Sequence, residues 1–155
     1  MYGEGAGANI ENSGKITGTN LENSMGIVAS GATTIKNTGE VDIQGTGVIG
    51  LVAKGGSAAV NSVGSNAKIK ATGNSSAAVY TDAGTVNLEG GAITAEGGAI
   101  DLYSNGGMIN VSNNNMQTLI NTGQKSLAFM TANGGKINLA SSTQATIAGG
   151  SDSTT

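Results

Sequence analysis

An apolar residue that opens an alternating segment recurs about every 25 residues, and this period restricts the possible fold more than any other feature. The six anchor positions are Ile10, Ile35, Val60, Val86, Ile109 and Ile137. Successive anchors are separated by 25, 25, 26, 23 and 28 residues. Repeats of this length are typical of solenoids and propellers, in which each repeat buries its apolar face against the next one.

Within each repeat the apolar residues alternate with polar ones over short stretches. Examples are Val41-Asp42-Ile43, Lys68-Ile69-Lys70 and Ile137-Asn138-Leu139. A period of two indicates a β-strand with one buried face. Clusters of Gly, Asn and Ser separate these stretches, as turns require. Each repeat holds about three such stretches, so it contains three short strands and three turns.

These patterns predict an all-β fold, a right-handed single-stranded parallel β-helix of about six coils of 23–28 residues with three short strands per coil. The coils are expected to start at Ala8, Thr33, Ala58, Thr85, Met108 and Lys136. A propeller blade needs about 40 to 50 residues, and the leucine-rich pattern is missing from the sequence. Right-handedness follows the usual chirality of parallel crossovers.

The whole chain, residues 1–155, is expected to form one β-helix segment. Residues 1–7 resemble the end of a third strand and are expected to complete a preceding coil. Residues 150–155 are interpreted as a polar tail or as the start of an incomplete coil. Because solenoids need polar or covered ends and neither end shows an obvious cap, we interpret the chain as an internal fragment of a longer protein.

One polar position is expected to stack from coil to coil. Asn12 and Asn37 occupy the same turn position relative to their anchors, and Asn61 lies one residue nearer its own anchor. Stacked amides in such a row would satisfy one another's hydrogen-bonding groups. We therefore expect an amide ladder between Asn12 and Asn37.

Composition excludes several functions. The formal net charge is −3 and the seven cationic residues are dispersed, which argues against nucleic acid as a partner. The sequence has no Cys, and its apolar runs are too short for a membrane helix. It shows no signal peptide. The absence of His excludes the usual serine–histidine catalysis.

No catalytic, cofactor-binding or metal-binding residue is predicted, and the chain is not expected to be an enzyme. Glu40 and Asp42 share a strand face, as Lys68 and Lys70 would, and a charged strand face most often serves solubility. Calcium remains a minor alternative, because carboxylates and Asn at turns are oxygen ligands. The calcium-binding G-G-x-G-x-D run is not present in the sequence.

Two further groups of residues have an ordinary structural interpretation. The glycine pairs at 90–91, 97–98, 106–107 and 134–135 are expected in turns, since neither Walker spacing nor a following helix supports a phosphate loop. Tyr80, Tyr103 and Phe129 fall near the third strand of successive coils. An aromatic stack is favoured there over a sugar-binding platform.

Two motifs resemble a known family. The turn N-[ST]-G-x-[IV] occurs at residues 12–16 and 37–41, and the run G-[IL]-V-A-x-G occurs at residues 26–31 and 50–55. Together they resemble the passengers of type V autotransporters, above all the long adhesins of the fusobacterial type. The first two coils match these motifs well and the later coils match loosely.

The resemblance implies a non-catalytic stalk or adhesion segment of a secreted, cell-surface passenger. It implies an outer-membrane barrel elsewhere in the same polypeptide and display outside the cell. It also implies that the full-length protein attaches to protein or glycan receptors on host or bacterial cells. The alternative is a carbohydrate-binding or carbohydrate-cleaving β-helix, lyase-like or tailspike-like, in which acids such as Glu96 or Asp101 would contribute to a cleft.

Overall fold

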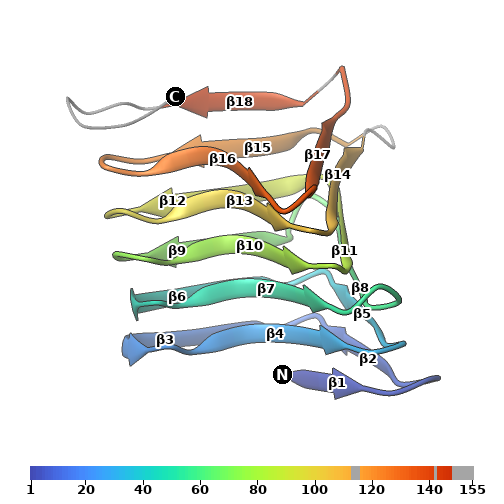
Figure 1. The fold of residues 1–155 in the computed structure, drawn as a ribbon. Helices are drawn as coiled ribbons and strands as arrows, with labels where there is room; N and C mark the ends of the chain where they lie inside the picture. The colour runs from blue at the N-terminus through green and yellow to red at the C-terminus, as the bar shows by residue number, and fades with distance from the viewer. Residues whose placement is uncertain (113–115, 142, 148–155) are drawn as a thin grey trace.

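The structure, a computed structural model, describes residues 1–112, 116–141 and 143–147. Throughout that part of the chain the regular secondary structure is β-strand, and the strands form three parallel six-stranded sheets. Figure 1 shows the coils stacked in chain order from β1 at one end to β18 at the other. The predicted all-β parallel β-helix is confirmed.

Each sheet collects the strands that hold the same place in successive coils. The first-strand sheet contains β2 (Asn9–Asn12), β5 (Thr34–Asn37), β8 (Ala59–Val63), β11 (Thr85–Glu89), β14 (Met108–Ser112) and β17 (Lys136–Leu139). The second-strand sheet contains β3 (Lys15–Glu22), β6 (Glu40–Thr46), β9 (Lys68–Thr72), β12 (Gly91–Glu96), β15 (Thr118–Thr122) and β18 (Gln144–Ile147). The third-strand sheet contains β1 (Tyr2–Glu4), β4 (Met25–Ser30), β7 (Ile49–Lys54), β10 (Ala77–Asp82), β13 (Ile100–Asn105) and β16 (Leu127–Ala132).

The chain completes five coils between β2 and β16, compared with the six that the sequence predicts. The strands β17 and β18 supply the first two sides of a further coil. At the other end β1 lies beside β4, with Tyr2 paired to Val28, and so occupies a third-strand position. The tail predicted at 150–155 lies outside the described residues.

The predicted anchors form one continuous ladder in the first-strand sheet. Backbone pairing runs in register from Ile10 through each anchor in turn to Ile137. The four anchors of the middle coils, Ile35, Val60, Val86 and Ile109, are 0% exposed. Side chains of like shape therefore stack along the interior at the strand spacing of about 4.8 Å.

The other two sheets contribute equivalent interior ladders. In the second-strand sheet the buried row contains Val41, Ile69, Ile93 and Ile120. In the third-strand sheet it contains Ile27, Leu51, Val79 and Leu102. Three apolar ladders thus meet in the middle of the coil and form a single core along its length.

The predicted amide ladder is present and short. Asn12 Nδ2 donates to Asn37 Oδ1 at 2.8 Å, and Asn37 Nδ2 donates to Ser62 Oγ at 3.1 Å. Asn37 is fully buried and also donates to the Gly39 carbonyl at 3.3 Å. Asn61 pairs with Lys36 in the ladder and lies on the outer face, which agrees with its position one residue nearer the anchor.

Glycine at the corners allows neighbouring coils to approach closely. Gly106 and Gly134 have φ of +72° and +77°, a region that glycine adopts at little cost. Their neighbours are restricted differently: a Cβ on Gly107 would lie 2.4 Å from the Gly84 carbonyl oxygen, and one on Gly135 would lie 2.2 Å from that of Ser104. The glycine pairs therefore serve turn geometry and coil contact.

We expect Asn37→Ala to lower the free energy of unfolding by about 1–3 kcal/mol, because it leaves the buried Asn12 and Ser62 groups without a partner. Chemical denaturation followed by circular dichroism measures this loss. Asn61→Ala, on the outer face, is the matched control and is expected to cost less. Equal losses in the two variants would contradict the assignment of the inner ladder.

Candidate binding surface

The outward face of the first-strand sheet is polar along the coils. Lys36 forms an ion pair with Glu11 at 3.1 Å, and from the third coil on this row continues as asparagine. A second amide ladder, on this outward face, joins Asn61, Asn87, Asn110 and Asn138 through hydrogen bonds of 2.7, 2.9 and 2.8 Å. Asn87 and Asn110 both donate and accept within this ladder, Asn61 accepts and Asn138 donates, so this face is largely satisfied within the protein.

The outward face of the second-strand sheet carries most of the paired charges. Lys15 lies 2.8 Å from Glu40, and Lys70 lies 2.8 Å from Glu96. As predicted, Glu40 and Asp42 share the outward face of β6, and Lys68 and Lys70 share that of β9. The two acids lie directly opposite the two lysines. The hydrogen bond from Lys15 lowers the pKa of Glu40. Because these groups are exposed, such pairs add little to stability and mainly keep the surface soluble.

The outward face of the third-strand sheet differs, because it is apolar. We call it the apolar face and define it by two outward rows of ladder partners. The first row is Tyr2, Val28, Val52, Tyr80, Tyr103 and Met130. The second row is Met25, Ile49, Ala77, Ile100 and Leu127. Large contiguous apolar surfaces on soluble proteins usually mark interaction sites.

Two tyrosines form the centre of the apolar face. The rings of Tyr80 and Tyr103 stack edge to face with centroids 5.1 Å apart, and Asn105 Nδ2 donates to Tyr80 Oη at 3.1 Å. Phe129 does not join them, contrary to the predicted stack of three. It pairs with Leu102 on the inner face and packs against the core, while Met130 takes the outward place beside Tyr103.

A shallow groove of about 550 Å³ lies across the N-terminal half of this face. Its lining includes Val28 and Val52 on β4 and β7, with Tyr2 and Tyr80 on the strands to either side. Val52 is only 2% exposed, yet it does not belong to the core cluster. By contrast Tyr2 is 59% exposed. The valines therefore lie low on the face between taller tyrosines.

The groove has a charged edge. Lys54 and Asp82 line it from adjacent positions on β7 and β10. Among the described residues, neither the Lys54 nor the Asp82 side chain forms a hydrogen bond or an ion pair with any other residue. An apolar floor with convergent charged groups at the edge is the usual composition of a binding surface.

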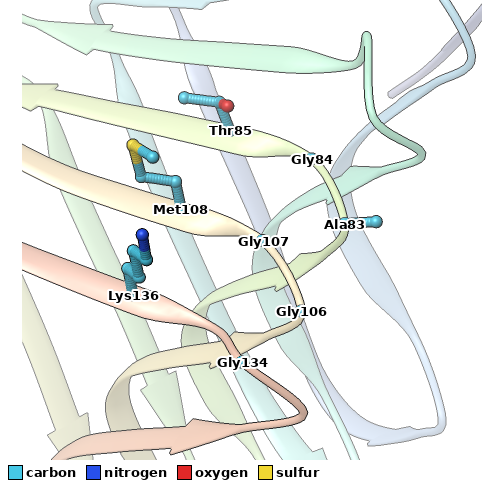
Figure 2. A pocket seen from close by; sticks show the side chains of 8 residues that line it. All are labelled: Ala83, Gly84, Thr85, Gly106, Gly107, Met108, Gly134 and Lys136. Atoms are coloured by element: carbon cyan, nitrogen blue, oxygen red, sulfur yellow. The ribbon is translucent and has the colours of Figure 1, made fainter.

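A smaller hollow lies at the corner between the third-strand and first-strand sheets (Figure 2). It measures about 220 Å³ and is lined mainly by turn glycines, among them Gly84, Gly106 and Gly107. Among the described residues that line it, Lys136 is the one with a titratable side chain. Figure 2 shows that Thr85, Met108 and Lys136 project from successive strands on the same side, so the hollow gathers no acid–base pair.

Of the two acids named in the carbohydrate alternative, one points outward from the β-helix and the other lies in its interior. Glu96 is on the outward face of β12 in its ion pair with Lys70. Asp101 is 0% exposed, and its Oδ2 accepts a hydrogen bond from Thr122 Oγ1 at 2.5 Å. Its Oδ1 has no hydrogen-bond partner. Burial raises the pKa of Asp101 to about 7, although the hydrogen bond from Thr122 opposes this shift.

No protein-family model, curated protein or solved structure matches this chain. Within the described residues no three His, Cys, Asp or Glu side chains gather to bind a metal ion. That same part of the chain has no helix with the length and apolar character of a membrane span. On the described surface, the apolar face with its groove is the feature that most favours binding.

Asp101 is expected to make stability fall as pH rises. Because its carboxyl has a pKa of about 7 in the folded protein and an ordinary value of 3.8, the folded state binds the proton more tightly. The resulting loss in the free energy of unfolding is absent below about pH 4 and grows between about pH 4 and 7. It then levels off at on the order of 4 kcal/mol. Asp101→Asn should flatten this profile.

Urea denaturation of both proteins between pH 4 and 8 measures the effect. Glu22→Gln, which removes the same charge at the exposed end of β3, controls for net charge. Parallel profiles for the native protein and Asp101→Asn would contradict an uncharged, buried carboxyl.

Proposed function

We propose that this chain is a rigid, non-catalytic stalk segment of a cell-surface adhesin passenger of the autotransporter type. The proposal combines the observed β-solenoid with the turn motifs at residues 12–16 and 37–41. In this role the segment is extracellular and the full-length protein attaches to host or bacterial cells. The segment supplies length and surface, and binds no cofactor.

The observation that supports the stalk most directly is the unbroken stacking of coils. Every described strand pairs in parallel with its equivalent one coil away, and the three interior ladders are buried throughout the middle coils. Each added coil lengthens such a rod by about 4.8 Å. A solenoid of this kind resists bending because backbone hydrogen bonds run along its whole axis.

The carbohydrate alternative has one observation in its favour, the outward pair Tyr80 and Tyr103 with Asn105 beside it. Aromatic rings with a polar neighbour can bind a sugar. Cleavage would additionally need an acid and a base near the rings. Glu96 belongs to a different sheet and Asp101 is buried, so neither forms an exposed acid–base pair with the tyrosines.

Deleting residues 85–107 tests the stalk. This change removes one whole coil and joins Gly84 to Met108, which occupies the same ladder position as Thr85. In the surface-displayed adhesin that carries the segment, we expect display and cell attachment to be retained. The purified chain should keep its β-sheet circular dichroism, and its length in small-angle scattering should shorten by about 5 Å.

Deleting residues 85–95 is the matched control, because it ends within a coil and forces later strands out of register. This variant should lose both display and attachment. If the whole-coil deletion folds but cells no longer attach, a localised binding site lies in that coil and the stalk proposal is wrong.

A further inference from the structure

The apolar face is stepped along the coil axis. In its first row the groove lies over β4 and β7, where the outward residues are the small Val28 and Val52. In the same row the ridge lies over β10 and β13, where the outward residues are Tyr80 and Tyr103. Groove and ridge occupy adjacent pairs of strands in the same sheet.

The groove and the ridge lie on either side of the middle of the third-strand sheet, which falls between β7 and β10. A two-fold axis lying in the face there, parallel to the strands, exchanges β7 with β10, β4 with β13 and β1 with β16. This rotation lays the ridge of each copy in the groove of the other. Val52 then faces Tyr80 of the second copy, and Val28 faces its Tyr103.

We propose that the apolar face is the interface of a two-fold dimer, in which a second copy of this chain packs face to face with its coil axis antiparallel. The self-complementary shape is one reason to assign a second copy as the occupant. An isologous interface needs one surface patch that fits itself, and small residues opposite large ones provide that fit.

Charge supplies a second, independent reason. Lys54 and Asp82 are ladder neighbours on β7 and β10, immediately on either side of the proposed axis. The rotation places Lys54 opposite Asp82 of the second copy, and it does so twice. Complementary charges at an interface edge determine the register and suppress other arrangements.

The other face-to-face arrangement lacks both forms of complementarity. A two-fold axis parallel to the coil axis would set the ridge of Tyr80 and Tyr103 on the same ridge of the second copy. It would also turn Lys54 toward the apolar row that contains Ile49. The antiparallel dimer is therefore the arrangement that this surface favours.

The size of the face indicates how tight the dimer is. Five strands of six residues contribute about 20 Å of length each and the three-residue β1 about 10 Å, so at a spacing of about 4.8 Å they cover on the order of 500 Å² per copy. The total of about 1,000 Å² is typical of weak, reversible interfaces. We expect reversible association in the micromolar range.

Sedimentation velocity of the full chain from about 1 to 300 µM tests the proposal. The native chain should dimerise, and Lys54→Asp or Asp82→Lys should each weaken dimerisation at least about tenfold. An equimolar mixture of the two variants should associate again, because both contacts then join opposite charges: Asp at 54 faces Lys at 82 in one contact, and the native Asp82 faces the native Lys54 in the other. Lys68→Asp, on the second-strand sheet, should dimerise like the native chain.

Far-UV circular dichroism checks that each charge variant remains folded. A native chain that stays monomeric at 300 µM would overturn the proposal. So would a dimer that tolerates both charge reversals, or a mixture of the two variants that fails to associate.

Cysteine pairs test the orientation, since the chain has no cysteine of its own. Sheets packed face to face lie about 10 Å apart, so a thiol-reactive cross-linker that spans about 10 Å should link a mixture of Val28→Cys and Tyr103→Cys into a dimer. Val28→Cys alone should not be linked, because its two copies lie about 14 Å apart along the axis and so about 17 Å apart in all. Efficient cross-linking of Val28→Cys with itself would overturn the antiparallel arrangement.

Discussion

The stacking of each strand on its equivalent one coil away is the interaction on which the rest of the structure depends. It satisfies the backbone along the axis and places like side chains above one another, as the ladder from Ile10 to Ile137 illustrates. It also restricts the corners, where Gly107 and Gly135 leave no space for a Cβ against the preceding coil. One extra residue is nevertheless accommodated within a strand, at the bulge between Gly18 and Leu21 of β3.

The interior could be predicted from the sequence because the coil period and the alternation of two agree. All six anchors and the stacking of Asn12 on Asn37 were found as expected. Phe129 was misassigned, since a shift of one residue in a strand moves a side chain from the outer to the inner face. The exact alignment of the third strand is needed to place it.

The apolar face and Asp101 were not predicted as such. The signal for the apolar face was present in the consecutive apolar residues around Val28 and Val52, which indicate a strand covered on both faces. Asp101 occupies an inward corner where the preceding coils carry Gly26, Gly50 and Ala78. The sequence around Asp101 does not distinguish such a corner from an exposed turn.

The three outward faces divide the surface by chemistry. Two are satisfied by amide ladders and ion pairs, as the bonds from Asn61 to Asn138 illustrate, and one is apolar and stepped. A stalk needs only the first kind of face. The apolar face gives the proposed stalk a means of self-association, through contacts that do not interrupt the stacking of coils.

The distance between spin labels on Glu11 and Asn138 tests the in-register stack most directly. These positions belong to one outward row of the first-strand sheet and are separated by five coil steps. The structure predicts a single backbone separation of about 24 Å at 4.8 Å per step. A broad distribution, or a distance well beyond this value, would contradict the parallel β-helix.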